Sequence, residues 1–197
     1  PENFLGGYEV FADGSYTWGF SNSGLTSVNF SGLGSGTFNF VEGDNSRLQF
    51  IENDGFVGIG NVYPGKLFVM DNGEGNGFCV GVEYPSAPIT QSQIAGNYKM
   101  LSITTFREEQ VGYFSLPTSG KDISFYEELN DGTIYHSSQE GVFINSFEKD
   151  ANFNNLFKMT MTVEYDWEVK VYFIILPGEM MMYFSTEPDG SIGAYGL

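Results

Sequence analysis

Apolar and polar residues alternate over short stretches along the whole chain, and each stretch ends at glycine, proline, asparagine or aspartate. Residues 159–163, for example, read Met-Thr-Met-Thr-Val, and this period of two is typical of a strand with one buried face. Residues 8–11 and 16–20 flank an Asp-Gly turn and predict a hairpin. The pattern therefore predicts strands from end to end, with residues 149–157 expected to hold a helical turn.

Glycine landmarks divide the chain into two similar halves. Gly36 and Gly112 each lead an aromatic strand, and the strand after each runs into Asn-Asp-Gly, ending at Gly55 and Gly132. Such matched landmarks predict an internal duplication. We expect an all-β fold of two similar antiparallel β-meander units, 1–84 and 94–197, joined by a proline-containing linker, 85–93. Units of this kind form small barrels or sandwiches, either as separate bodies or packed as one.

Composition narrows the functions that the chain can serve. The 197 residues carry 25 acidic and eight basic side chains, a formal net charge of −17, so nucleic acid and anionic membranes are disfavoured partners. No run of 18 apolar residues occurs, and no transmembrane segment is expected. A chain that is rich in aromatics and turns and poor in lysine is typical of proteins outside the cytoplasm, and we expect a periplasmic, cell-surface or secreted location.

The sequence holds no recognisable catalytic or cofactor-binding motif. One histidine, His136, and one cysteine, Cys79, are too few for a zinc site. Glu127 and Glu128 are adjacent on a predicted strand and should point to opposite faces, so they do not form a pair of catalytic acids. Residues 71–77 read either as a glycine-rich hairpin turn or as a calcium loop. We expect a protein that is not an enzyme and needs no cofactor or metal.

Two groups of side chains are candidates for ligand binding. Four aromatic residues lie close to turns, where rings are often exposed and can stack on a sugar: Tyr16, Trp18, Tyr165 and Trp167. Met180 and Met182 share one face of a predicted strand and either line a pliable apolar pocket or belong to the core. We treat all six as candidate binding residues.

The openings of the two halves resemble the first strand of lipocalin-like barrels. These openings read Leu5-Gly6-Gly7-Tyr8 and Ala95-Gly96-Asn97-Tyr98, with tyrosine where that family has tryptophan. The resemblance implies an up-and-down barrel whose mouth binds an apolar molecule, with Gly6, Tyr8, Gly96 and Tyr98 in structural roles. It identifies no ligand-contacting residue.

These observations predict a non-catalytic binding protein for a small apolar, lipid-like molecule or a glycan. The alternative is a structural or adhesive surface subunit that self-associates through the edges of its strands. An enzyme would need two distant acids that meet in a cleft.

Overall fold

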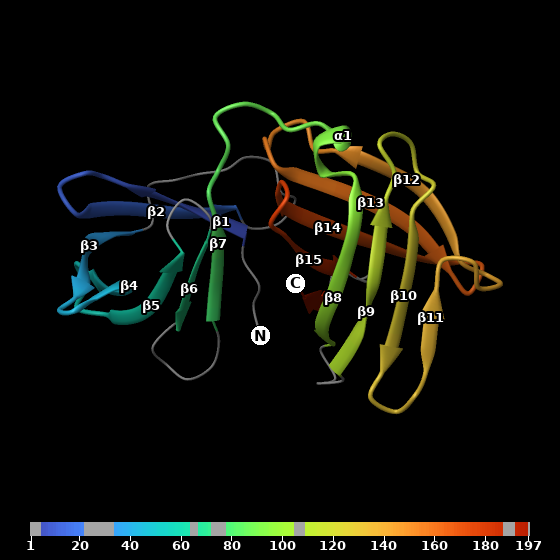
Figure 1. The fold of residues 1–197 in the computed structure, drawn as a ribbon, viewed down its shortest axis with the longest axis horizontal. Coiled ribbons are helices and arrows are strands. Elements are labelled where there is room, and N and C mark those ends of the chain that lie inside the picture. The colour runs from blue at the N-terminus through green and yellow to red at the C-terminus, as the bar shows by residue number, and fades with distance from the viewer. Residues whose placement is uncertain are drawn as a thin grey trace. The chain divides into compact units, whose positions relative to one another are not determined.

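A computed structural model describes residues 5–21, 34–63, 67–71, 78–104, 109–186 and 192–196. The chain divides into two compact units, Pro1–Glu83 and Tyr84–Leu197 (Figure 1). Both units consist of antiparallel strands, each paired with its neighbours in the sequence, so the prediction of an all-β fold built from meanders is confirmed.

The described part of the first unit is a meander of seven strands whose order in the sheet follows their order in the chain. The sheet curls so far that the ring of Tyr8 on the first strand meets the ring of Phe68 on the sixth edge-on, with 5.6 Å between centroids. The result is a nearly closed barrel. Its strands are β1 (Leu5–Val10), β2 (Ser15–Ser21), β3 (Gly34–Val41), β4 (Asp44–Glu52), β5 (Val57–Tyr63), β6 (Leu67–Asp71) and β7 (Phe78–Val82).

Aromatic side chains fill the inside of the first barrel. Leu48 and Phe50 alternate with exposed or half-buried residues on β4, as a strand with one buried face requires. Tyr16 is only 1% exposed, and its ring meets that of Phe50 nearly edge-on, with 5.7 Å between centroids. Edge-to-face contacts of this kind add to the stabilisation that burial alone provides.

The second unit is also a meander, and its first and last strands pair with each other. The order in the sheet is β11-β10-β9-β8-β16-β15-β14-β13-β12, so every strand lies beside its chain neighbours except across the gap between β11 and β12. The unit is thus a barrel left open along one seam. Its elements are α1 (Gln91–Ile94), β8 (Gly96–Thr104), β9 (Glu109–Leu116), β10 (Ser124–Leu129), β11 (Ile134–His136), β12 (Phe143–Lys149), β13 (Leu156–Val163), β14 (Trp167–Leu176), β15 (Met180–Thr186) and β16 (Ile192–Gly196).

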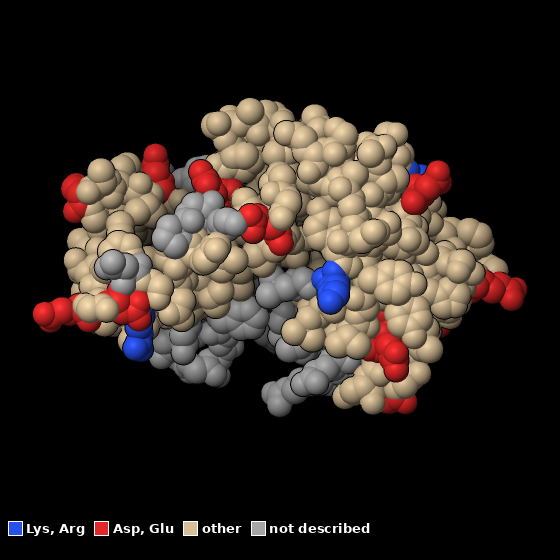
Figure 2. All heavy atoms as spheres, viewed as in Figure 1, with Lys and Arg blue, Asp and Glu red and all other residues tan. Residues whose placement is uncertain are grey.

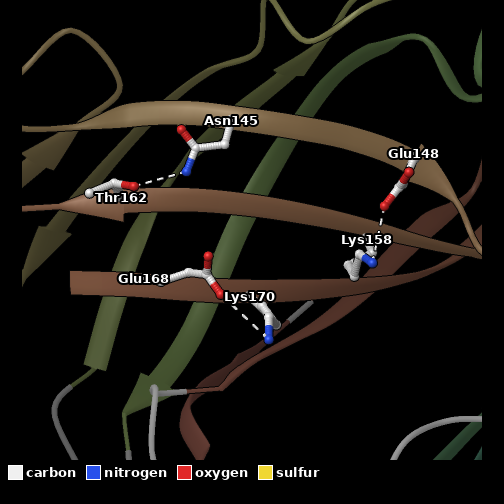
Figure 3. A network of polar contacts seen from close by, with 6 residues as sticks. All are labelled: Asn145, Glu148, Lys158, Thr162, Glu168 and Lys170. Atoms are coloured by element: carbon white, nitrogen blue, oxygen red, sulfur yellow. Dashed lines mark hydrogen bonds and ion pairs between the residues drawn. The ribbon is translucent and has the colours of Figure 1, made fainter. Parts of the chain in front are cut away.

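The second barrel is flattened, because side chains from opposite walls touch across its interior. Phe114 on β9 contacts Phe173 on β14, with 5.0 Å between ring centroids. The outer face of β12, β13 and β14 carries a network of polar contacts (Figure 3). Asn145 donates to Thr162 at 2.8 Å, and two lysine–glutamate ion pairs lie on the same face. The alternation of apolar and polar residues therefore sorts the inner from the outer surface.

The segment predicted as a linker packs against the second unit. Ile89 and Ile94 are buried in the core of that unit, and the backbone N–H of Ile89 donates to the carbonyl of Asn154 at 2.9 Å. The Asn154 side-chain amide donates to the carbonyl of Pro85 at 2.7 Å. The two prolines thus lie in a short segment without strand or helix, and Ile89 in this segment and Ile94 at the end of α1 enter the core.

The helical turn predicted at 149–157 is wrong, because these residues form the end of β12, a bend and the start of β13. The Lys149 ammonium group donates to the carbonyls of Asp150 and Phe153 at 2.8 and 2.7 Å. Together with the bonds of Asn154 to the segment before α1, these contacts stabilise the bend.

The two landmark glycines occupy similar places in their units. Gly36 on β3 lies opposite Glu52 on β4, and Gly112 on β9 lies opposite Glu127 on β10. At each glycine an added Cβ would collide with the backbone oxygen of the residue just before that glutamate. Both positions therefore require glycine because the neighbouring strand approaches too closely for a side chain.

The Asn-Asp-Gly turns at Gly55 and Gly132 also have the same form, since each glycine N–H donates to the carbonyl three residues earlier, at 3.0 and 2.9 Å. However, Gly14 makes the same bond to Phe11 in a hairpin without a counterpart in the other half. The turn is therefore a general hairpin device, and the glycine–glutamate pairs are the more specific likeness between the units.

Candidate functional site

Polar side chains point into the second barrel near one of its ends. Gln110 on β9, Glu127 on β10, and Tyr183 and Ser185 on β15 all occupy inward-facing positions. Gln110, Tyr183 and Ser185 are each less than 9% exposed. We call these four residues the polar end of the barrel. The strand registers place them towards the turns at 130–133 and 164–166.

The opposite end of the barrel is apolar and closed. Ile89 and Ile94, from the segment before β8, join the barrel core there and pack with inward-facing residues such as Leu116 and Ile175. The hydroxyl of Tyr98 donates to the carbonyl of Ile94 at 2.7 Å and holds α1 in place. The inner surface of the barrel is therefore apolar at the closed end and polar at the other.

Glu127 is the chemically most unusual residue of the polar end. Desolvation by the surrounding barrel raises the pKa of its carboxyl to about 7, and hydrogen bonding to the Tyr183 hydroxyl only partly offsets this rise. A carboxyl in an apolar environment disfavours its charged form, so a large fraction of Glu127 is neutral near physiological pH. Strongly shifted carboxyls of this kind are frequent at functional sites.

Exposed aromatic rings flank the polar end. Trp167 is the first residue of β14, lies on the same face of the strand as the buried Val169 and Val171, and is 50% exposed. Tyr165, in the turn before β14, is 64% exposed and has a φ of 73°. Its hydroxyl donates to Glu140 at 2.6 Å, and its ring lies 6.4 Å from that of Phe143. These rings could hold the apolar or sugar part of a ligand.

The six candidate binding residues lie in three different places. Tyr165 and Trp167 lie beside the polar end, whereas Tyr16 belongs to the core of the first barrel. Met180 and Met182 lie on the outer face of β15, because Met181 and Tyr183 occupy its inner face. Sequence reasoning therefore identified the rim of the polar end but missed its four inward-facing residues.

The sequence pattern could have identified Glu127, because this acid occupies an inward-facing position between two apolar residues of the same strand face, Phe125 and Leu129. An acid at a core position of an alternating strand is costly and needs a reason. Glu128, its neighbour, is exposed on the outer face, so the expectation that these two side chains point to opposite faces agrees with the structure.

Trp18 and Tyr16 bind a second inward-facing glutamate, in the first barrel. The Tyr16 hydroxyl donates to one oxygen of Glu52 at 2.7 Å, and the Trp18 indole N–H donates to the other at 2.9 Å. Tyr8 lies beside both rings, and burial raises the pKa of its hydroxyl. Both oxygens of this carboxylate are thus occupied by partners from β2.

Two further features bear on chemistry. Burial raises the pKa of the Cys79 thiol to about 11, so this thiol is not ionised at neutral pH and is a poor nucleophile. A shallow groove runs along the seam between β11 and β12, where the Lys121 ammonium group donates to the carbonyl of Asn145 at 3.2 Å. The groove is lined by Lys121, Asp122, Ile123, Ser137, Val142, Phe143, Ile144 and Asn145.

Acidic side chains are spread over the surface of both units in the view of Figure 2, and basic ones are scarce there. Within the described ranges, no three His, Cys, Asp or Glu side chains gather as a metal site would require, and no helix is long and apolar enough to cross a membrane. The possible calcium loop at 71–77 lies, from residue 72 onward, outside the described residues.

Comparison of the chain with known protein families, characterised proteins and solved structures finds no match. Function must therefore be argued from the site itself.

Proposed function

We propose that the second unit is a non-catalytic binding barrel, which takes a small ligand with an apolar body and a polar head through its polar end. The observation that supports this is the one-sided distribution of Gln110, Glu127, Tyr183 and Ser185 in a barrel whose other end is closed by Ile94 and its neighbours. A binding site typically combines an apolar lining with a few convergent polar groups, and four polar side chains at one end of an apolar interior favour a ligand with a polar head there.

The apolar part of such a ligand would meet Met161, Val163 and Trp167. Met161 and Val163 lie on the inward face of β13 and pack only partly buried against the core, and Trp167 pairs with Val163 in the register. A thioether side chain can repack around ligands of different shape. This lining favours a lipid-like or aromatic body and also suits a sugar stacked on Trp167.

The lipocalin-like resemblance remains part of this proposal. What supports it is the up-and-down strand order with paired first and last strands, together with the structural use of Tyr98. We further propose a location outside the cytoplasm and an ancestral duplication. The pairs Gly36–Glu52 and Gly112–Glu127 support the duplication, because the same close approach recurs at both.

The experiment uses the two tryptophans of the chain. A Trp18→Phe variant leaves Trp167 as the only tryptophan, and its emission reports on the polar end. Native mass spectrometry first identifies any co-purifying molecule, and 1-decanol is then titrated as an uncharged amphiphile. We expect saturable changes in the Trp167 emission. A Trp167→Phe variant, which retains Trp18, is the control and should show none. No saturable response and no co-purified ligand would overturn the proposal.

A second candidate is self-association through the open seam. β12 pairs only with β13, and β11 only with β10, so both present an unpaired edge in the described sheet. Exposed edges can accept a strand from another chain. Sedimentation velocity on the native protein and on an Ile144→Pro variant tests this, because proline removes a donor and blocks pairing at the edge. A monomer at all concentrations would exclude it.

A further inference from the structure

We infer that the ligand of the polar end carries a positively charged amine, which forms an ion pair with Glu127. This inference rests on the proposed function and names the chemical class of its ligand. Its basis is the position of Glu127: an inward-facing carboxyl among aromatic and neutral polar side chains, at the end of the barrel opposite to Ile89 and Ile94.

No charged group among the described residues faces Glu127. Its register partners are Gly112 on β9 and Tyr135 on β11, and the Tyr183 hydroxyl of β15 acts on it across the barrel interior. Ser185 is the other buried polar residue on the inner face of β15. Gln110 is the other polar group on its own wall. Glycine, tyrosine, serine and glutamine can donate hydrogen bonds, but none of them neutralises an ionised carboxylate.

The amine of every described lysine in the second unit lies away from Glu127. Lys158 and Lys170 form ion pairs with Glu148 and Glu168 on the outer face, as Figure 3 shows. The three others are accounted for as well: Lys121 binds a carbonyl in the seam, Lys149 binds carbonyls in the bend after β12, and Lys99 is exposed opposite Tyr113 on the outer face. A ligand can therefore supply a positive charge that the described part of this unit does not.

The surroundings of Glu127 also suit an amine by their chemistry. The faces of aromatic rings attract cations, and Tyr183 and Trp167 lie on the strands that flank the polar end. Burial without a cation raises the pKa of Glu127, and an ammonium group beside it would lower that pKa again and favour the ionised form. The net charge of −17 adds a field that attracts cations and repels anions.

The test compares three ligands that share one ten-carbon chain: decylamine, 1-decanol and decanoate. Each is titrated below its micelle concentration into the Trp18→Phe protein at pH 8, where the amine is protonated and Glu127 is mostly ionised. We expect decylamine to bind about tenfold or more tightly than 1-decanol, because a desolvated ion pair adds to the shared apolar contact. Decanoate should bind most weakly.

Two further variants decide whether Glu127 is responsible. Glu127→Gln keeps the size of the side chain and removes its charge, and it should reduce decylamine affinity about tenfold while leaving 1-decanol nearly unchanged. Glu128→Gln, on the outer face, is the matched control and should change neither. Decylamine affinity should also fall as the pH is lowered from 8 to 6, since protonation of Glu127 removes the charge.

The outcomes separate the two proposals. If 1-decanol binds but decylamine binds no better, or if Glu127→Gln leaves decylamine affinity unchanged, the amine inference is wrong and the binding barrel stands. Tightest binding of decanoate would overturn the inference in the same way. If none of the three ligands gives a saturable response, the binding proposal fails, and the amine inference fails with it. Thermal melting of each variant confirms that it is folded.

Discussion

Replacing Glu127 by glutamine should stabilise the second barrel at pH 8 and have little effect at pH 5. Burial raises the pKa of this carboxyl to about 7 in the folded protein, from its ordinary value of 4.5. The folded state therefore binds more protons than the unfolded state between these two values. Below pH 4.5 the carboxyl is neutral in both states, and its burial carries no charge penalty. As the pH rises through 7, the penalty for the ionised form develops in full.

The size of the effect follows from the shift. One pKa unit corresponds to about 1.4 kcal/mol, so the shift of Glu127 is worth roughly 2–4 kcal/mol of unfolding free energy at pH 8. Glutamine has nearly the same volume as glutamate, but it has no charge to bury. The free energy of unfolding of Glu127→Gln should thus exceed that of the parent by an amount that grows between pH 5 and pH 8.

The assay is urea unfolding, followed by the emission of Trp167 in the Trp18→Phe background, so that the second unit is observed by itself. The parent, Glu127→Gln and Glu128→Gln are compared at pH 5, 6, 7 and 8. The difference between the parent and Glu127→Gln cancels the pH dependence of the other acids. A difference that stays flat with pH, or a Glu127→Gln protein that is less stable at pH 8, would refute the reasoning.

Three further substitutions test the structure elsewhere. Ile94→Ala should destabilise the second unit by about 2–5 kcal/mol, because the substitution leaves a cavity at a fully buried position of the closed end. Urea unfolding followed by Trp167 emission measures this loss. An unchanged unfolding free energy would mean that the segment does not pack into the core. Gly112→Ala should destabilise the same unit by about 1 kcal/mol or more, since its Cβ collides with the backbone of β10, whereas Ser115→Ala on the same strand should not. Tyr16→Phe removes one donor to Glu52 and should lower the stability of the first unit by about 1–3 kcal/mol; unchanged unfolding followed by Trp18 emission in the Trp167→Phe background would contradict this role.

The fold class could be predicted because alternation and turn chemistry are local. Residues 159–163 alternate in the sequence, and Met159, Met161 and Val163 do face inward in the structure. The hairpin at Asp13-Gly14 likewise depends on residues next to each other, since the Ser15 N–H donates to the Asp13 carboxylate at 2.9 Å. Patterns that depend on only a few neighbouring residues can be recognised in the sequence, because packing against distant parts of the chain does not alter them.

The packing of the predicted linker could not be inferred in the same way. Pro85 and Pro88 indicate a segment that holds no strand, and its backbone has none, although Gln91–Ile94 form the short helix α1. What the prolines do not reveal is that Ile89 and Ile94 meet a core assembled from β9, β12 and β14. The core residues that this segment contacts lie far away in the sequence, so no local pattern predicts the contact.

The candidate site likewise combines residues that a local sequence pattern predicts with residues that only the fold brings together. The sequence predicts Tyr165 and Trp167 because both aromatic residues lie next to turns, whereas it gives no sign that Tyr183 belongs to a site. Its relation to Glu127 depends on β10 and β15 lying in opposite walls of one barrel. The closure of that barrel rests on the pairing of β8 with β16, which no local pattern predicts.

The two inward-facing glutamates explain why the proposed binding site lies in the second barrel and not in the first. Glu52 accepts hydrogen bonds from Tyr16 and Trp18, one on each oxygen, so its carboxylate is satisfied within the protein. Glu127 lies opposite an equivalent glycine, yet the described residues act on it only through the hydroxyl of Tyr183. A carboxylate with both oxygens bonded gains little from a ligand, whereas a desolvated one that no described cation faces gains much. Adding a second donor beside Glu127 should therefore weaken amine binding, just as removing the donors of Glu52 should destabilise the first barrel without creating a comparable site.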